Sequence, residues 1–203
     1  MRNTLFKRIG AYAIDYLFIF LLLTMLNQIR ILNPNYDEYI SAYDEYVEIY
    51  NDMNAENVVE IAESAEYQKV NYDLSRYGLS YSIISIIVYL AYFVGFQKWN
   101  KNQTLGKKMF NIKVASNDDA KVKWWQMLLR CVIVYNVLIE LVLIILVLVL
   151  NYQAFTVASS ILTLLASIIF YVNVFFIIFR KDGRGLHDLL AKTKVEEISN
   201  GNR

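Results

Sequence analysis

The sequence predicts an all-α membrane protein with four transmembrane helices, an external acidic helical hairpin and a small cytoplasmic β-like segment. Three observations predict this fold class: the composition, four long apolar stretches and an uneven distribution of charge. Hydrophobic residues make up 57% of the 203-residue chain and charged residues 19%, whereas soluble domains average about 45–50% apolar and about 25% charged residues. The single cysteine and single histidine exclude an intramolecular disulfide and metal sites built from several histidines.

Four apolar stretches are long enough to cross the hydrocarbon core of a bilayer, which needs about 20 residues. They cover residues 9–29, 79–96, 132–150 and 154–179. The third and fourth stretches are separated only by residues 151–153, so we expect a tight helical hairpin there. The whole chain, residues 1–203, is expected to form a single membrane domain.

Basic and acidic residues are concentrated on opposite sides of this four-span arrangement. The N-terminal end carries three basic residues and no acidic residue before the first span. Residues 97–131 hold eight basic and two acidic residues, and the tail 180–203 holds six basic and four acidic residues. The loop 30–78 holds eleven acidic and three basic residues. Because cytoplasmic loops carry an excess of lysine and arginine, both termini are predicted to be cytoplasmic and the acidic loop external.

The external loop carries an amphipathic helical pattern. Apolar and tyrosine side chains recur at spacings of three and four along residues 36–53, and a second, weaker helical stretch covers residues 55–67. We therefore expect a helical hairpin. Its tyrosine-rich surface has two interpretations. Either the two helices pack on each other, as short helices require for stability, or residues 36–67 dock a membrane-protein partner or a second copy of the chain.

The cytoplasmic segment 97–131 contains all three tryptophans of the chain among lysines, a pattern typical of anchors at the headgroup level. Apolar and polar residues alternate along 110–114, a turn is expected at 117–119, and alternation resumes along 122–124. This pattern predicts a short β-hairpin. The tail residues 193–196 alternate in the same way and could add a strand.

Polar side chains interrupt the apolar spans. Asp15 lies in the first span, Asn136 and Glu140 in the third, and Asn173 in the fourth. A charged group at the centre of a span costs about 2.5–3.5 kcal/mol on insertion scales, so each requires an explanation. Since a helix rises about 1.5 Å per residue, all four lie at a similar depth in the inner half of the membrane. Asn136 and Glu140 are four residues apart and are expected to share one helical face.

Two interpretations of this polar layer stay open. In the structural one, the groups satisfy each other and hold the four helices in register. In the functional one, Asp15 and Glu140 form a negative pocket that binds a cation or a proton. No basic residue lies within one helical turn of Asp15, and such a carboxyl group is suited to exchanging a proton for an ion.

A second polar group is expected at the cytoplasmic face. Arg8 and Arg130 lie at the mouths of the first and third spans, and Asp188 lies in the tail, four residues after Arg184. The lowered dielectric at a helix mouth strengthens ion pairs. We therefore predict that Arg8, Arg130 and Asp188 lie close together.

Four segments carry a resemblance to a known family. They are residues 6–15, 103–114, 129–130 and 184–195. In order and residue type they resemble the RDD family of small bacterial membrane proteins, which is named for an arginine and two aspartates. The resemblance implies that Arg8 is this arginine, Asp15 the intramembrane aspartate and Asp188 the second aspartate. Gly106 and Lys107 belong to the central motif.

The resemblance and the intramembrane carboxylates favour a cation/proton transporter or exchanger. Members of the family are described as poorly characterised, with cation–proton exchange suggested for some. A homo-oligomer is expected, because four spans form a thin pathway. The long acidic loop 30–78 departs from the family pattern and favours the alternative, a non-enzymatic accessory, regulatory or protective (immunity-type) subunit that docks another membrane or envelope protein.

Motifs for catalysis or for a cofactor are not recognisable in the sequence. The neighbouring His187 and Asp188 lack a nucleophile or further ligands, and Gly183 and Gly185 lack the spacing and strand context of a phosphate loop. We therefore expect a multi-pass protein of the bacterial cell membrane that is not an enzyme. It is expected to use no cofactor and to bind the lipid bilayer and protein partners rather than nucleic acid.

Overall fold

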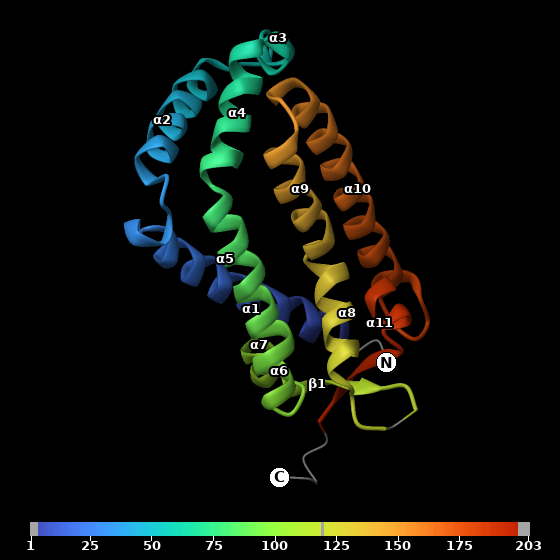
Figure 1. Ribbon diagram of the computed structural model, residues 1–203. Helices are drawn as coiled ribbons and strands as arrows, with labels where there is room; N and C mark the ends of the chain where they lie inside the picture. The colour runs from blue at the N-terminus through green and yellow to red at the C-terminus, as the bar shows by residue number, and fades with distance from the viewer. Residues whose placement is uncertain (1–3, 119, 199–203) are drawn as a thin grey trace. The chain divides into compact units, whose positions relative to one another are not determined.

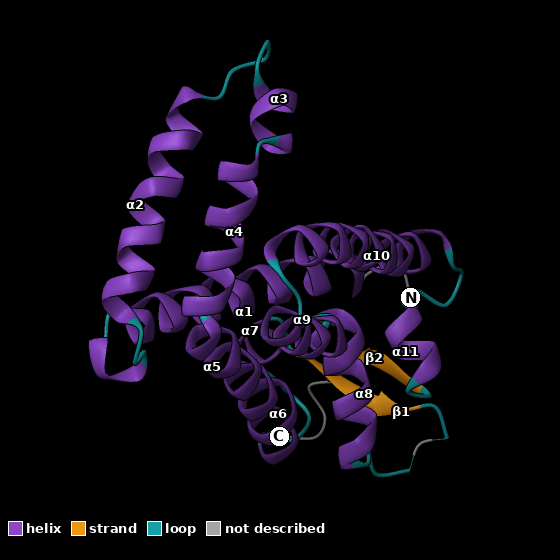
Figure 2. Ribbon diagram, turned by 45° about the horizontal axis from the view of Figure 1, so that its top comes forward, coloured by secondary structure: helices purple, strands orange, loops and turns teal. Residues whose placement is uncertain are grey.

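The computed structural model of the protein describes residues 4–118 and 120–198. Most of these residues are helical, and two short strands pair beside the helices (Figures 1 and 2). In chain order the elements are α1 (Thr4–Asn27), η1 (Arg30–Leu32), α2 (Tyr36–Asp52), α3 (Val58–Glu63), α4 (Ala65–Tyr77), α5 (Leu79–Leu90), η2 (Ala91–Phe96), α6 (Gln97–Trp99), α7 (Leu105–Met109), β1 (Ile112–Ser116), α8 (Trp124–Val134), α9 (Val137–Val149), α10 (Tyr152–Phe179), α11 (Leu186–Leu190) and β2 (Thr193–Glu197).

The predicted all-α membrane fold is confirmed. Three helices are long and apolar enough to cross a membrane by length and composition: α1, the continuous helix Leu79–Trp99 and α10. The pair α8 and α9 qualifies as a fourth span when the break between them is included. Each of the four predicted apolar stretches therefore coincides with helix.

The third predicted span is not one uninterrupted helix. It starts earlier than residue 132, because α8 begins at Trp124, and it is broken between Val134 and Val137. At the break, Asn136 adopts the left-handed conformation with φ 51°, which cannot continue a right-handed helix. The prediction that Asn136 and Glu140 share one uninterrupted helical face is therefore wrong.

The chain folds into two compact units. Unit 1 comprises the described residues of 1–24, 86–138 and 166–203, and unit 2 comprises residues 25–85 and 139–165. The RDD-like motifs lie in unit 1, whereas the acidic segment 30–78 lies in unit 2.

In unit 2 the predicted helix 36–53 corresponds to α2, but the second predicted stretch, 55–67, is broken at Ser64, and the helix that completes the hairpin is α4. Helices α2 and α4 pack side by side (Figures 1 and 2), and the rings of Tyr46 and Tyr67 lie with their centroids 6.0 Å apart across the pair. Ser64 ends α3 and caps α4, since its hydroxyl accepts a hydrogen bond of 3.2 Å from the Tyr67 backbone N–H. A side-chain cap of this kind satisfies one of the free amide groups at a helix start.

The core of unit 2 lies where α4 meets the end of α9 and the start of α10. Tyr72, Val147 and Phe155 are buried together there. The Tyr72 hydroxyl donates to the backbone carbonyl of Leu150 at 3.1 Å. This contact satisfies a carbonyl group that the end of α9 leaves without a helical partner.

In unit 1, strands β1 and β2 pair antiparallel with Val114 opposite Val195. The predicted hairpin between residues 110–114 and 122–124 is therefore wrong, and the tail supplies the partner strand. Val122 instead packs with Val114 and Met127 in a small core. Lys123 is the N-cap residue of α8, and its backbone N–H donates a hydrogen bond of 2.8 Å to the Gln126 side chain. Asp119, in the predicted turn, lies outside the described residues.

The left-handed residue at the helix break gives a direct test of the fold. Asn136→Gly is expected to leave stability near the wild-type value, because glycine adopts a positive φ without steric cost. Asn136→Val is expected to lower the free energy of unfolding by about 1–2 kcal/mol, since a Cβ is disfavoured in this conformation and a β-branched one most of all. Thermal unfolding of both variants in detergent measures the difference. Equal stability of the two variants would contradict a break at this residue.

Candidate functional site

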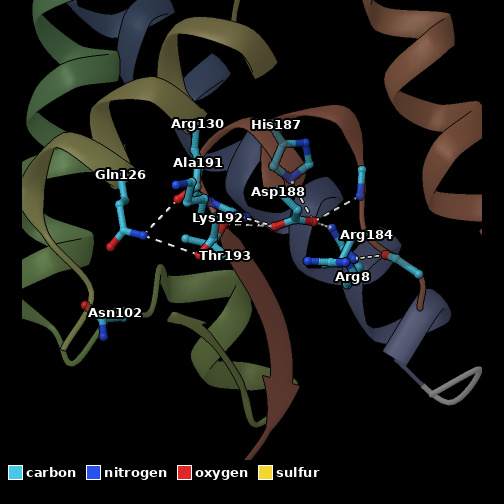
Figure 3. Close-up of polar contacts among 12 residues, drawn as sticks. Arg8, Asn102, Gln126, Arg130, Arg184, His187, Asp188, Ala191, Lys192 and Thr193 are labelled. Carbon is cyan, nitrogen blue, oxygen red and sulfur yellow. Dashed lines mark hydrogen bonds and ion pairs between the residues drawn. The ribbon is translucent and has the colours of Figure 1, made fainter. Parts of the chain in front are cut away.

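The first polar cluster of unit 1 surrounds Asp188, which lies in α11 and is completely buried. Its Oδ1 accepts from the Arg130 guanidinium, and its Oδ2 accepts from Arg8 Nη2 at 2.6 Å (Figure 3). The Gly185 backbone N–H and the Thr193 hydroxyl donate to the same carboxylate at 3.1 and 3.3 Å. The predicted proximity of Arg8, Arg130 and Asp188 is therefore observed.

The charge on Asp188 is stabilised by its neighbours. Burial alone would raise the pKa of this carboxyl group, but the positive charges of Arg130 and Arg8 outweigh burial and hold the pKa well below its usual range. The carboxylate is therefore ionised at any physiological pH. Arg184, the residue four positions before it, forms an ion pair with Asp182 at 2.8 Å. The arginines that pair with Asp188 are therefore Arg8 and Arg130.

The chain's histidine connects this cluster to α10. Asn173 Oδ1 accepts from the His187 backbone N–H at 3.3 Å and lies 2.6 Å from the His187 ring Nδ1. The Asn173 amide oxygen only accepts, and so does the Asp188 carboxylate, whose Oδ2 lies 3.3 Å from Nε2. A neutral ring donates to one of them, and the shorter contact assigns the proton to Nδ1. Burial lowers the pKa of His187 to about 3, even though Asp188 favours the charged form. Asn173, a predicted member of the polar layer, thus orients α11.

The second polar cluster surrounds Asp15 in α1, whose side chain is 2% exposed. Its Oδ1 accepts from the Tyr92 hydroxyl at 2.7 Å and from the Gly106 backbone N–H at 2.8 Å. Its Oδ2 accepts from the Thr104 hydroxyl at 2.5 Å. Tyr92 lies in η2, a π-helical turn within the second span, and such turns occur frequently at functional sites.

Gly106 allows the segment that binds Asp15 to approach α1 closely. A Cβ atom at Gly106 would lie 2.1 Å from the backbone oxygen of Ala11, a distance that no side chain tolerates. Thr104 caps α7, because its hydroxyl accepts from the Lys107 backbone N–H at 3.3 Å. The glycine and the threonine of the central motif therefore serve one purpose, which is to place two donors on Asp15.

Lys107 provides the charge that faces Asp15. Its Nζ lies 3.8 Å from Asp15 Oδ2 and 3.3 Å from the Thr104 hydroxyl. Burial lowers the pKa of Lys107 to about 8; Asp15 and Asp188 favour its charged form, while Arg130 and Arg8 oppose it. The ammonium group therefore titrates near physiological pH while the neighbouring Asp188 and His187 do not.

Both clusters line one cavity of about 240 Å³ in unit 1. The polar part of its lining consists of Arg8, Asp15, Gln97, Lys107, Arg130, Asn173 and His187. Apolar and aromatic side chains form the remaining walls, most of them from α1, α8 and α10 and the others from η2, β1, β2 and Tyr135. The cavity thus gives the Asp15–Lys107 pair a partly enclosed space with mostly apolar walls.

Three residues of the predicted polar layer, Asp15, Asn136 and Asn173, lie in unit 1. In the described part of this unit, no hydrogen bond connects them to one another. Asn136 lies at the helix break, and Glu140 lines a cavity of unit 2. Over residues 4–118 and 120–198, no group of three or more His, Cys, Asp or Glu side chains is arranged to hold a metal ion.

Sequence reasoning missed the roles of Tyr92, Thr104 and Thr193. Tyr92 lies in an uncharged span among other aromatic residues, and the two threonines lie within the motif segments 103–114 and 184–195. One signal for Thr104 was present, because a threonine that precedes a short helical stretch favours an N-cap. The contact of Lys107 with Asp15 joins two distant segments, and no local pattern reports it.

The neutral state of His187 can be measured directly, because the chain contains one histidine. With ¹⁵N-histidine labelling and a purification tag free of histidine, NMR is expected to show one neutral ring with its proton on Nδ1 from pH 5 to 8. The lowered pKa of about 3 requires this result, whereas an exposed histidine titrates near about 6.5. Formation of an imidazolium within this range would contradict the arrangement around Asn173.

Comparisons with known proteins agree with the motif pattern. The family model of the RDD family matches residues 2–192. A segment of 55 residues is 44% identical to a protein described as an uncharacterized membrane protein, YteJ, of Bacillus subtilis (strain 168). The match covers 27% of this chain and spans about a third (33%) of that relative. No solved structure matches the chain. Since the family model covers nearly the whole sequence, including Arg8, Asp15 and Asp188, the chain belongs to the RDD family.

Proposed function

We propose that this RDD-family membrane protein exchanges a monovalent cation for a proton, and that Asp15 and Lys107 form the exchange site. The observation that carries the proposal is the buried pair itself. An ammonium group lies 3.8 Å from a carboxylate on a common cavity, and burial lowers the pKa of this ammonium group to about 8. A titrating group near neutral pH beside a fixed partner is the arrangement that proton coupling requires.

The exchange follows from charge compensation. Below about pH 8 the Lys107 ammonium group neutralises Asp15. When Lys107 releases its proton, the Asp15 carboxylate lacks a compensating charge, and a monovalent cation takes the place of the proton. The ligands available to it are the carboxylate, the Thr104 hydroxyl and the Tyr92 hydroxyl, and oxygen ligands suit hard cations. Rebinding of a proton by Lys107 expels the cation, so that one charge replaces one charge.

The arginine cluster has a different part in this mechanism. Arginine stays protonated at all physiological pH values, and the pKa of Asp188 is held far below neutrality. Neither group can carry the exchanged proton. Arg8 and Arg130 instead add fixed positive charge that favours the deprotonated form of Lys107.

We also propose that both termini and residues 97–131 lie in the cytoplasm, and that residues 30–78 lie outside. The counts of basic residues in these segments support this orientation. The polar clusters of unit 1 then lie at the inner face of the bacterial cell membrane.

The orientation is tested with single cysteines at two exposed positions. In a background in which the buried Cys131 is replaced by serine, a membrane-impermeant maleimide added to intact cells is expected to label Asn51→Cys and not Asn117→Cys. Both side chains are exposed in the structure, so accessibility through the membrane decides the result. Permeabilised cells, in which both variants should react, provide the control. The reverse pattern would overturn the proposed orientation.

The exchange is tested in vesicles that contain the purified protein and a pH-sensitive dye in the lumen. A gradient of Na⁺, K⁺ or Li⁺ is expected to move protons, with a midpoint near pH 8 set by Lys107. Asp15→Asn is expected to abolish this movement. Lys107→Arg keeps the positive charge but cannot release a proton, and it is also expected to abolish it.

Lys108→Arg is the matched control, because Lys108 is the exposed neighbour of Lys107 and should leave the flux unchanged. If Lys107→Arg retains the wild-type pH dependence, Lys107 is not the proton carrier. If wild-type vesicles move no protons with any of the three cations, the exchange proposal fails.

The alternative is an accessory or regulatory subunit that docks a membrane partner through residues 36–67. The observation that favours it is the exposure of apolar and aromatic side chains on α2 and α3, with Tyr50 59%, Val58 41% and Val59 67% exposed. Exposed apolar side chains that lie together mark interaction sites. Two results together would favour this alternative: a stable hetero-complex in protein purified natively from its host, and no proton movement in the vesicle assay.

A further inference from the structure

Unit 2 contains a cavity of about 660 Å³ that the exchange site does not use. Its walls are formed by α2, α4, the start of α5, α9 and the start of α10, together with Asn27 at the end of α1. Pockets for small organic molecules usually measure about 300–1,000 Å³. The cavity is therefore of the size that a small organic ligand fills, and too large for a bare ion held by one carboxylate.

The charge of the cavity is negative. Among the described residues that line it, Glu140 is the only acidic one, and none is lysine or arginine. The Glu140 side chain makes no hydrogen bond or ion pair with the part of the chain that the structure describes. An uncompensated carboxylate within a membrane helix is costly and marks a functional site. A cationic ligand supplies the charge that the protein itself does not.

Tyrosines form a large part of the wall. Tyr39, Tyr43 and Tyr46 follow at spacings of four and three along one side of α2, and Tyr67 and Tyr81 come from α4 and α5. The rings of Tyr39 and Tyr81 meet edge to face with centroids 5.0 Å apart. Aromatic faces attract cations through the charge distribution of the ring. The tyrosines and Glu140 therefore favour the same kind of ligand.

Two buried polar atoms on this wall lack hydrogen-bond partners. They are the hydroxyl oxygen of Tyr81, whose residue is 7% exposed, and the side-chain oxygen of Asn27. Buried polar groups are normally hydrogen-bonded, and each exception requires an explanation. Both atoms accept hydrogen bonds, as does the Glu140 carboxylate. A ligand that donates several hydrogen bonds satisfies all three.

We propose that this cavity binds a small organic amine in its protonated form. The positive charge of such an amine matches Glu140, its N–H groups match the acceptors of Tyr81 and Asn27, and its hydrocarbon part matches the tyrosine rings and the apolar residues of α9. An anion finds no positive group here, and a neutral molecule leaves Glu140 uncompensated. This inference does not depend on the exchange reaction, because none of its residues belongs to the Asp15–Lys107 site.

The test measures binding of benzylamine, which is protonated at pH 7, to the detergent-purified full chain by titration calorimetry. Benzyl alcohol, of similar size but neutral, is the comparison ligand. The wild-type protein is expected to bind benzylamine more tightly. Glu140→Gln is expected to weaken benzylamine binding by about tenfold or more, as loss of a charge-assisted hydrogen bond does, and to leave benzyl alcohol binding unchanged.

A second variant separates binding from folding. Tyr81→Phe removes an unpartnered buried hydroxyl and is expected to raise the melting temperature of the ligand-free protein, yet to weaken benzylamine binding by about threefold to tenfold. Glu60→Gln on the exposed surface of α3, and Lys107→Arg in the exchange site, are expected to bind benzylamine as the wild type does. Equal binding of benzylamine and benzyl alcohol, or unchanged binding by Glu140→Gln, would overturn the proposal.

Discussion

Most of unit 1 depends on the burial of the Asp188 carboxylate between two arginines. Arg8 and Arg130 lie 180 and 58 positions away from it in sequence, so their contacts bring the first helix, α8 and the tail together. A buried carboxylate is stable only when positive groups and hydrogen-bond donors surround it, and loss of one partner leaves an uncompensated charge. The three segments are therefore stable only as an assembled group, which explains why the tail packs against α8 through α11 and supplies the strand β2.

The arginine cluster also acts on the chemistry of Lys107 without being bonded to it. Burial accounts for most of the lowered pKa of this lysine, and Arg130 and Arg8 lower it further. Asp15 and Asp188 oppose them. The pKa of Lys107 is thus set by burial, by the ion pair with Asp15 and by the more distant charges of Arg130, Arg8 and Asp188. This balance links the structural cluster to the proposed exchange site, because any movement of α11 that shifts Asp188 alters the electrostatic potential at Lys107.

The parts of the fold that were predictable from the sequence are those set by local patterns. Apolar length located the spans, and periodicity located α2, because both depend on neighbouring residues along one helix. The strand pairing was not predictable, since residues 122–124 and 193–196 show the same alternation of apolar and polar side chains. The tail pairs with β1, whereas Val122 packs in a core with Met127, a contact that the alternation does not indicate. The helix break at Asn136 was hidden for another reason. One asparagine within an apolar run carries no signal for a positive φ, although asparagine tolerates that conformation better than most residues.

The two intramembrane carboxylates have opposite environments, and this difference determines what each can bind. Asp15 is satisfied by Tyr92, Thr104 and Gly106 and is faced by Lys107, so an incoming ion must replace a positive charge that the protein already provides. Among the residues that the structure describes, Glu140 has no such partner, so a ligand must bring both its charge and its hydrogen-bond donors. A small ion meets the first requirement by displacing a proton, and an organic amine meets the second without displacing anything. In the two proposals, the ligand of each site therefore follows from whether the protein itself supplies a positive charge beside the carboxylate, as it does for Asp15, or does not, as for Glu140.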